Sequence, residues 1–361
     1  MNKLADPFII VLGLFVSVSS FAQGLELYGR VYDGNEKYTS INDAYLEINI
    51  SGVEPSIEYP RDGKGNYRAV EFNVPNEKNV SIQASHSEYI QQNSINFKTT
   101  TFKKEQDIRM IRKNAFAEAN YLKAKKIEQD TDKQIDEAFS VGELSAELSP
   151  RSRYYLFLAD TIGRRIKIMK NDDELPSNMA TFISEIPEDG SFASFPNDKK
   201  KEFYTKIGYY FSRSKNLSSK PAGLKTCLQY SLEAYDSAIN ISPDEVAPYQ
   251  GKYLVLRESE NYLDAISVIE AYFEKNANIK SELTIKGLLV DWVDLIRSHT
   301  GFKGSTEEIE EQKSNDLYKR LWASLRRRLE QYKGYYQNPN ITGNKNLNDA
   351  YEISKRITAD E

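Results

Sequence analysis

Between residues 24 and 111 the chain alternates apolar and polar side chains in short runs. The runs cover residues 25–32, 44–50, 69–74 and 80–84. A period of two places one set of side chains in a core and the other in solvent, as in a β-strand. Turn-forming residues separate the runs, at Asp33-Gly34, Asp62-Gly63 and Pro75-Asn76. The pattern therefore predicts a small antiparallel β-sandwich over residues 24–111.

From about residue 113 onward the alternation is replaced by apolar residues at i, i+3, i+4 and i+7. This spacing is the period of an α-helix that buries one face. Prolines fall between the periodic segments, where helices end and begin. The predicted helices cover residues 114–128, 132–148, 152–169, 176–186, 199–214, 223–241, 246–258, 261–275, 280–298, 305–333 and 346–358.

Residues 1–22 have the pattern of a secretory signal peptide. Lys3 provides a basic start, residues 7–18 are apolar, and the small residues Ser20 and Ala22 precede the expected cleavage point. The apolar stretch is shorter than the roughly 20 residues that span a membrane. We expect cleavage and export to the periplasm, the outer membrane or the cell exterior, with peripheral association with the envelope. A retained amino-terminal anchor is the alternative.

Composition disfavours several classes of function. The 361 residues are 40% hydrophobic and 28% charged, with a net charge of −5. Such a chain folds into globular domains, and its acidic balance disfavours nucleic acid as a partner, because phosphate contacts need clustered positive charge. The chain has a single cysteine, Cys227, so it provides neither an intrachain disulfide nor a cysteine-based zinc site. Its two histidines, His86 and His299, leave little for histidine-dependent catalysis or metal binding. We expect no metal and no cofactor.

The sequence also lacks the common catalytic motifs. It contains no G-x-S-x-G, no H-E-x-x-H and no phosphate-binding Gly-Lys-Ser/Thr loop. Acidic runs such as residues 172–174 and 307–311 are alternatives for acid–base chemistry. Runs of this kind more commonly occupy solvated loops or helix amino termini, where the helix dipole favours acids. We therefore expect no enzymatic activity.

The β-rich part resembles the carboxypeptidase regulatory-like domain. The resemblance rests on four spaced motifs: Gly29-x-Val31-x-Asp33, Ala44-x-Leu46-x-Ile48, Asp62-Gly63-x-Gly65-x-Tyr67 and Ser87-Glu88-Tyr89. It implies a transthyretin-like sandwich of seven strands, in which the tyrosine after the glycine-rich turn packs back on the core. It also implies a non-catalytic accessory role, often at the start of exported outer-membrane or periplasmic proteins. The family often has a glycine where this chain has Ser87-Glu88.

The helical part resembles the tetratricopeptide repeat (TPR). Segments of similar pattern begin thirty-four residues apart, at Leu228 and Tyr262. In two places a small residue is followed twelve residues later by a proline: Ser231 to Pro243 and Ala138 to Pro150. Small residues let antiparallel helices approach closely, and the proline ends the pair. The resemblance implies a solenoid of stacked helix pairs over residues 113–361, although Tyr253 stands where the repeat has a small residue. An irregular helical bundle with chance spacing is the alternative.

Tyrosine is common in this chain, with 24 residues, and many of them lie in the repeat region. Large rings in paired helices either fill the core or remain on the concave face, where tyrosine suits the recognition of a peptide. The sequence leaves both interpretations open. The candidate partner-binding tyrosines are Tyr209, Tyr249 and Tyr253.

A helix near the carboxyl end is apolar on one face and basic on the other. It covers residues 317–332, with Trp322 on the apolar face and Arg326 and Arg327 among the basic residues. One interpretation is contact with an acidic partner or a membrane surface. The other is a terminal helix that caps the solenoid and leaves a solvated basic face. All three residues are candidate partner-binding residues.

The sequence thus predicts an N-terminal antiparallel β-sandwich, residues 24–111, followed by an all-α TPR-like solenoid, residues 113–361. The predicted function is that of an exported, non-catalytic scaffold or adaptor that binds a protein or peptide through its helical repeats, in a cell-envelope or secretion assembly. The alternative is glycan binding or surface adhesion, with exposed tyrosines and Trp322 stacking on sugar rings.

Overall fold

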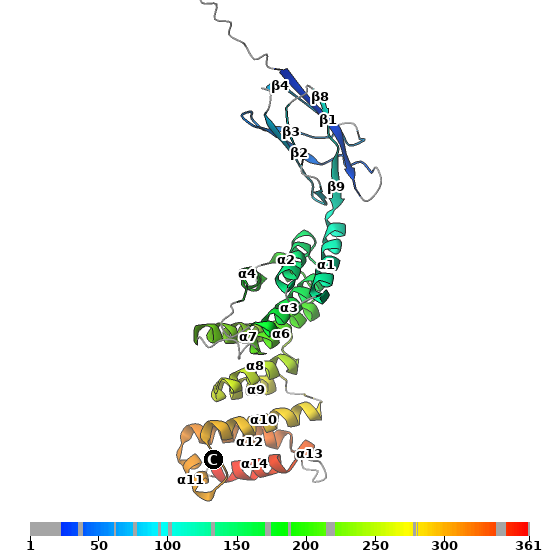
Figure 1. Ribbon diagram of the computed structural model, residues 1–361. Helices are drawn as coiled ribbons and strands as arrows, with labels where there is room; N and C mark the ends of the chain where they lie inside the picture. Colours follow the sequence, from blue (N-terminus) through cyan, green and yellow to red (C-terminus); the bar gives the residue numbers. More distant parts are fainter. Residues whose placement is uncertain are drawn as a thin grey trace, which may run out of the picture. The chain divides into compact units, whose positions relative to one another are not determined.

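The computed structural model describes residues 23–34, 39–60, 63–74, 78–92, 95–99, 103–130, 134–169, 175–186, 189–213, 221–276, 279, 281–336 and 344–359. The chain divides into two compact units, Met1–Glu118 and Ala119–Glu361. Strands form most of the first unit and helices form the second (Figure 1). The predicted signal peptide, residues 1–22, lies outside the described residues.

Nine strands are described in the first unit. They are β1 (Gln23–Asp33), β2 (Tyr45–Ile50), β3 (Ser56–Glu58), β4 (Asn66–Val74), β5 (Asn79–Ser85), β6 (Tyr89–Gln91), β7 (Ile95–Lys98), β8 (Lys103–Glu105) and β9 (Ile108–Arg112). The alternating runs of the sequence correspond to β1, β2, β4 and β5. The remaining strands are too short for a period of two to distinguish them from loops, and the sequence did not predict them.

The strands form a mixed, nearly closed, barrel-like sheet in the order β3-β2-β5-β6-β9-β1-β4, while β7 pairs with β5 and β8 with β1. β1 is antiparallel to β4 but parallel to both β8 and β9. The expectation of a purely antiparallel sandwich, with the seven strands that the resemblance implies, was therefore wrong. Alternation along one strand records which face is buried, but it carries no information about the direction of the neighbouring strand.

The core of this unit is built from the inward side chains of the alternating strands. Leu46, Ile48, Val31, Ile108 and Met110 are all completely buried. On β2 and β5 the buried positions are register partners, because Leu46 lies opposite Ala84 and Ile48 opposite Ile82. This cross-strand pairing stabilises the sheet and leaves the intervening side chains on its outer face.

The glycine and the tyrosine of the spaced motifs meet in the structure. Gly29 and Tyr67 are register partners in β1 and β4. A Cβ on Gly29 would stand 2.2 Å from the carbonyl oxygen of Gln106, which also accepts a hydrogen bond of 2.6 Å from the Tyr67 hydroxyl. Only glycine permits this approach of the backbone, and the buried Tyr67 ring lies against it.

The second unit is helical, and α1 begins directly after β9, within the last residues of the first unit. The helices are α1 (Lys113–Asp130), α2 (Ile135–Leu148), α3 (Ser152–Ile168), α4 (Ser177–Glu185), α5 (Gly190–Ala193), α6 (Asn197–Arg213), α7 (Pro221–Ile241), α8 (Val246–Glu258), α9 (Tyr262–Lys275), α10 (Glu282–Thr300), α11 (Thr306–Ser314), α12 (Asp316–Gln331), α13 (Lys333–Tyr336) and α14 (Asn344–Ile357). Most bounds agree with the predicted ranges to within about two residues. The short helices α5 and α13 were not predicted as separate elements.

The predicted helix over residues 305–333 is in fact two helices, α11 and α12. Asn315 separates them, and its side-chain carbonyl accepts hydrogen bonds from the backbone N–H groups of Leu317 (3.0 Å) and Tyr318 (3.2 Å). Asparagine is a strong amino-terminal cap, and this cap starts α12. Residues 310–316 contain no apolar side chain, so the apolar spacing is interrupted at the break, and the predicted range overlooked this interruption.

Successive helices contact one another in chain order, α2 with α3, α3 with α6, α6 with α7, α7 with α8, α8 with α9 and α9 with α10. α10, α12 and α14 then pack together at the carboxyl end (Figure 1). This is a TPR-like arrangement of stacked helix pairs, in which each helix buries its apolar face against its neighbours. No helix among the described residues is both long and apolar enough to cross a membrane.

Small residues occupy the tightest helix contacts. Ser231 of α7 is completely buried and donates a 2.7 Å hydrogen bond to the carbonyl oxygen of Gly208 in α6. The ring of Tyr235, also in α7, lies between two glycines. A Cβ on Gly208 would stand 2.9 Å from this ring, and one on Gly251 of α8 would stand 2.2 Å from it. Tyr235 therefore joins three helices, and each glycine leaves room for its ring.

Gly251→Ala is expected to lower the free energy of unfolding, because the new methyl group would overlap the Tyr235 ring. Overpacking of this kind costs about 1–3 kcal/mol, and it outweighs the gain of up to about 1 kcal/mol from replacing a glycine within a helix. Urea unfolding followed by circular dichroism measures the difference.

The matched control is Gly287→Ala in α10, where a Cβ meets no atom within 4 Å. This variant should be as stable as the parent or more stable. In a Tyr235→Ala background the penalty of Gly251→Ala should disappear, since the colliding ring is gone. Equal effects of Gly251→Ala in both backgrounds would contradict the proposed role of the ring.

Candidate partner-binding face

Helix α6 packs against both α3 and α8, and polar contacts connect the three helices. Between α3 and α6, Asp160 accepts hydrogen bonds from Lys206 Nζ (2.6 Å) and from the Tyr210 hydroxyl (2.7 Å). Between α6 and the start of α8, Lys201 forms an ion pair with Glu245. The three helices therefore form one face with fixed spacing.

Polar contacts also connect α8 to α10. The Tyr253 hydroxyl of α8 donates to the carboxylate of Asp291 in α10, and Arg257 lies 4.0 Å from the same carboxylate. Burial first, and then the Asp291 hydrogen bond, raise the pKa of the Tyr253 hydroxyl well above its ordinary value. Tyr253 thus stays protonated and serves as a neutral donor that joins two helices.

A shallow groove of about 510 Å³ lies between α6 and the amino-terminal end of α8. We call it the α6–α8 groove. Its lining is Asp198, Lys201, Glu202, Thr205, Lys206, Tyr209, Tyr210, Glu245, Ala247 and Pro248. Ala247, Pro248 and the two rings provide apolar surface, and the ion pairs Lys206–Asp160 and Lys201–Glu245 provide polar groups around it.

Tyr209 is the predicted site residue that remains accessible in this groove. Its side chain is 48% exposed, and its hydroxyl forms no hydrogen bond with another described residue. The ring packs edge-on against Tyr210 at 5.7 Å and lies 5.4 Å from the guanidinium of Arg213. Neighbours on two sides restrict the ring while one side stays open, which is a favourable arrangement for a recognition residue.

Three other predicted site residues are buried. Tyr249 and Tyr253 are 2% exposed and Trp322 is 0% exposed. Tyr249 packs against Tyr272 of α9 at 5.0 Å, and Trp322 packs against Phe302 at 5.5 Å. Their assignment to a partner-binding surface is therefore corrected, because these rings fill the interfaces between helices and none of them is accessible to a partner.

The two arginines lie on α12, which packs against α10 and α14. Arg326 Nε forms an ion pair of 3.0 Å with Glu330, and its Nη1 donates to the Thr358 hydroxyl at 2.8 Å. Arg327 is exposed, with a hydrogen bond of 3.4 Å to Ser324. Arg326 therefore joins the last helices together, in agreement with the capping interpretation, and neither arginine belongs to the α6–α8 groove.

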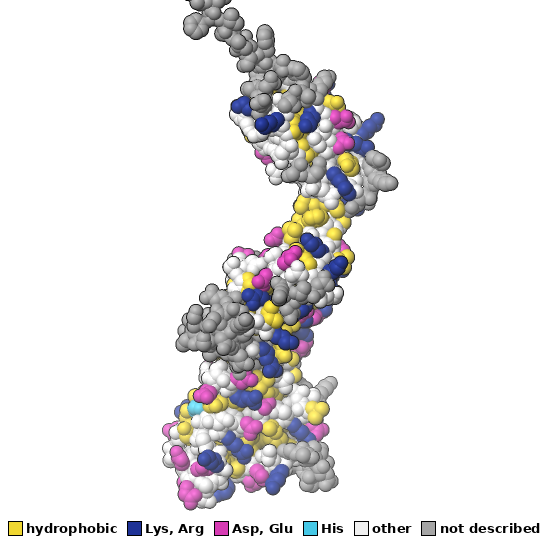
Figure 2. Space-filling view, viewed as in Figure 1, with side chains coloured by type: hydrophobic (Ala, Val, Ile, Leu, Met, Phe, Trp, Pro, Cys, Tyr) yellow, Lys and Arg dark blue, Asp and Glu magenta, His cyan; other side chains and the backbone are white. Residues whose placement is uncertain are grey.

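Charges of both signs are interspersed over the helical unit on the face shown in Figure 2. Among the described residues on this face, no block of one charge sign stands out, so the face offers no strong attraction to a highly charged partner.

An acidic cavity of about 600 Å³ lies among α2 to α5, and Glu143, Glu147, Glu185 and Asp189 are in its lining. Asp189 caps α5 by accepting from Ser191 N at 2.8 Å and also accepts from the Tyr155 hydroxyl, which gives it a structural role.

Sequence reasoning missed the partners of Tyr209. Tyr210, Lys206 and Ala247 line the groove, but nothing in their spacing connects α6 to α8. The available indication was the helical period of α6, where the buried residues Phe203, Ile207 and Phe211 define the inward face. Residue 209 lies away from this face. A plot of each helix around its axis would have placed Tyr209 outside the buried face of α6, and Tyr249 and Tyr253 on the buried face of α8.

No family model matches this chain, and no curated protein matches it. Among solved structures, the TPR2AB-domain:pHSP90 complex of yeast Sti1 is 11% identical, with a TM-score of 0.21, over 67% of this chain and 99% of that one. A computationally designed self-assembling cyclic homooligomer is 13% identical, with a TM-score of 0.16, over 68% and 95%. Scores this low support no inference, so the TPR-like description rests on the helix contacts themselves.

Proposed function

We propose that this chain is an exported, non-catalytic scaffold that binds an extended peptide segment of a partner protein in the α6–α8 groove. The observation that carries the proposal is Tyr209, an exposed ring at the edge of a partly apolar groove, whose hydroxyl has no hydrogen-bond partner among the described residues. Interfaces derive much of their affinity from a few aromatic anchors, and tyrosine is among the commonest of these.

The groove specifies the kind of peptide. Ala247 is exposed and lines the groove together with the Tyr209 ring, so an apolar or aromatic side chain of the peptide fits there. Lys206 and Glu245 lie around it with opposite charges, each paired with another residue of the face. A peptide with one apolar anchor and polar flanking residues therefore suits the groove better than a uniformly charged one.

Export and envelope location are part of the proposal. They rest on residues 1–22, whose basic start, apolar stretch and small residues fit a signal peptide. The motifs of the β unit, among them Gly29 and Tyr67, support an accessory domain of the carboxypeptidase regulatory-like type. In this proposal the β unit is a docking module and the helical unit holds the partner.

A random peptide library displayed on phage, selected against the full chain, tests the groove. We expect selected peptides to share an apolar anchor residue. Tyr209→Ala should raise their Kd at least about tenfold, which corresponds to the loss of one aromatic anchor. Isothermal titration calorimetry with the synthetic peptides provides the measurement.

Tyr59→Ala is the matched control. Tyr59 is a tyrosine of nearly equal exposure, 49%, in the β unit, and its removal should leave the peptide Kd unchanged. Selection of no peptide, or equal Kd values for the parent and Tyr209→Ala, would exclude the groove as the binding site.

A further inference from the structure

The outer face of the β unit carries a row of neutral polar side chains. On β5 the inward residues Val80, Ile82 and Ala84 are buried, so Ser81, Gln83 and Ser85 point outward. Directly opposite residues of antiparallel strands share a face. On one side of β5, Asn96 of β7 lies opposite Ser81. On the other side lies β2, where Tyr45 is opposite Ser85, Glu47 is opposite Gln83 and Asn49 is opposite Ser81. We call this surface the β5 outer face.

Several of these groups have unused hydrogen-bonding capacity. Gln83 and Asn96 are exposed, and their side-chain amides form no hydrogen bond with another described residue. The hydroxyls of Ser81 and Ser85 likewise have no hydrogen-bond partner within the part of the chain that the structure describes. Each amide offers two donors and an acceptor, and each hydroxyl offers one donor and acceptor lone pairs. The face therefore presents donors and acceptors in close alternation, which matches a ligand rich in hydroxyl groups.

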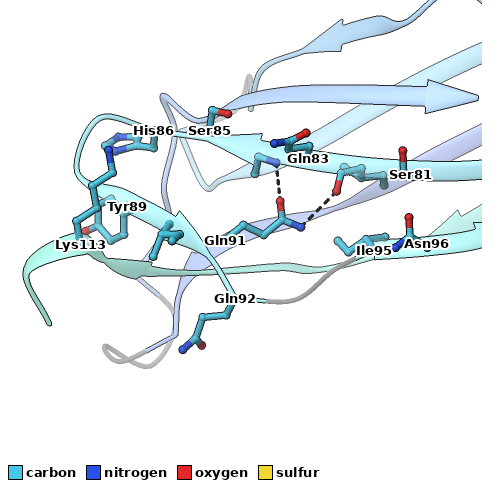
Figure 3. Close-up of a pocket in the computed structure, with 13 residues that line it drawn as sticks. Ser81, Gln83, Ser85, His86, Tyr89, Gln91, Gln92, Ile95, Asn96 and Lys113 are labelled. Carbon is cyan, nitrogen blue, oxygen red and sulfur yellow. Dashed lines mark hydrogen bonds between the residues drawn. The ribbon is translucent and has the colours of Figure 1, made fainter. Parts of the chain in front are cut away.

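The surface is hollowed along these residues. Two cavities of about 680 and 620 Å³ both border on Ser81 and Asn96. Volumes of this size lie within the range of about 300–1,000 Å³ that is usual for ligand sites. Figure 3 shows the larger cavity, with Ser81 and Asn96 at one end and His86, Tyr89 and Lys113 at the other.

A side chain already occupies the backbone hydrogen-bonding groups at the sheet edge inside this cavity. Gln91 of β6 accepts a hydrogen bond from Ala84 N at 2.6 Å and donates to the Ile82 carbonyl oxygen at 3.3 Å (Figure 3). These are the backbone groups that an added peptide strand would need. Since Gln91 satisfies them, the geometry disfavours strand addition at this point and leaves the side-chain groups as the means of recognition.

Exposed aromatic surface borders the same face. Tyr59, directly after β3, is 49% exposed, and its ring packs edge-on against Tyr45 of β2 at 5.8 Å. Ile57 of β3 lies opposite Glu47 and is exposed as well. An exposed aromatic ring on the same face as these amides offers a stacking surface for the apolar side of a sugar ring. Glu47 accepts a hydrogen bond of 3.1 Å from the Asn49 amide. Lys98 of β7 lies on the same face, so its positive charge balances the negative charge of Glu47.

We propose that the β5 outer face binds a neutral oligosaccharide, with Tyr59 stacking on a sugar ring and Gln83 and Asn96 hydrogen-bonding to hydroxyl groups. Neighbouring strands are about 4.8 Å apart, so the distance from β3 to β7 is roughly 14 Å. A ligand that reaches from Tyr59 to Asn96 therefore contains several sugar units. This site is independent of the α6–α8 groove, and Trp322 has no part in it.

Isothermal titration calorimetry of the full chain against neutral hexasaccharides of glucose, mannose, xylose and galactose tests the proposal. We expect at least one of them to bind with a Kd in the millimolar range or below. Gln83→Ala should raise that Kd about threefold to tenfold, the range for one lost neutral hydrogen bond. Tyr59→Ala should raise it at least about tenfold.

Two control variants distinguish binding at the β5 outer face from binding elsewhere on the chain. Gln229→Ala removes an exposed amide from α7, and Tyr209→Ala removes an exposed ring from α6; neither should change the oligosaccharide Kd. Because Gln83 and Tyr59 are exposed, their variants should unfold at the parent's midpoint, which urea unfolding verifies.

The proposal fails if no neutral hexasaccharide binds at millimolar concentration, or if Gln83→Ala and Tyr59→Ala bind as the parent does. Binding confined to acidic oligosaccharides and abolished by Lys113→Ala would also overturn it, because the ligand would then be an anion. Failure of the peptide selection leaves this result unaffected, since Tyr59→Ala and Tyr209→Ala report on different units.

Discussion

Trp322→Ala is expected to lower the free energy of unfolding by about 3–5 kcal/mol, the usual cost of truncating a large buried ring. Trp322 is completely buried among α10, α11 and α12, where its indole N–H donates to Gln312 Oε1 at 3.2 Å. The substitution removes the packing with Phe302 and leaves the buried Gln312 carbonyl without that donor. Urea unfolding followed by circular dichroism measures the change.

Tyr209→Ala provides the comparison, because an exposed ring contributes little to stability. Its unfolding free energy should stay within about 0.5 kcal/mol of the parent. Trp322→Phe should lie between the parent and Trp322→Ala, since a smaller ring refills part of the cavity. If Trp322→Ala unfolded like the parent but failed to bind selected peptides, the assignment of Trp322 to a binding surface would be right after all.

The helices could be predicted from the sequence because their information is local. An α-helix forms its hydrogen bonds within one segment, and its apolar period depends only on its own residues. The predicted range 246–258 coincides with α8, and 152–169 differs from α3 by one residue. The break at Asn315 is local information too, because residues 310–316 lack apolar side chains and asparagine is a strong cap, but the predicted range ran across it.

The β unit was harder to predict because its information is not local. β1 pairs with β8 and β9, whose residues lie roughly eighty positions further along the chain. Alternation in β1 identifies Leu25, Leu27 and Val31 as buried, and the structure agrees. Nothing in that alternation fixes the partner strand or its direction, so the parallel pairs were unexpected.

The candidate sites likewise combine features that the sequence predicts locally with features that depend on the pairing of distant segments. The period of β5 could have placed Ser81, Gln83 and Ser85 on the outer face from sequence alone. The position of Tyr59 beside Tyr45 depends on the pairing of β3 with β2, which only the structure provides. For the helices, Tyr249 and Tyr253 are four residues apart and share a face, but their burial depends on α9 and α10 packing over that face.

Alkaline pH is expected to unfold the helical unit, because several tyrosine hydroxyls are buried in its interfaces. Tyr155, Tyr210 and Tyr253 donate hydrogen bonds to Asp189, Asp160 and Asp291. Burial first, and then the hydrogen bond to the carboxylate, raise the pKa of each of these hydroxyls above the ordinary value of 10.0. Ionisation would place a second negative charge beside each carboxylate in a partly dry interface.

The direction of the effect follows from linkage. A group whose pKa is raised in the folded state contributes stability in full below its unfolded pKa, and this contribution is lost as the pH rises above that value. Burial raises the pKa of Tyr235 to about 12. Near pH 12 this residue alone removes on the order of 2 kcal/mol of unfolding free energy. Stability should thus be level up to about pH 10 and fall steeply beyond it.

Urea unfolding at a series of alkaline pH values, together with the ultraviolet absorbance of tyrosinate, measures this dependence. Part of the 24 tyrosines should ionise only as the helical circular dichroism is lost. Tyr235→Phe cannot ionise at this position, so its stability should fall less between neutral pH and pH 12 than that of the parent, whatever its stability at neutral pH. Complete and reversible ionisation of all tyrosines with the helices intact would show that the hydroxyls are accessible to solvent and that the interfaces are looser than their burial indicates.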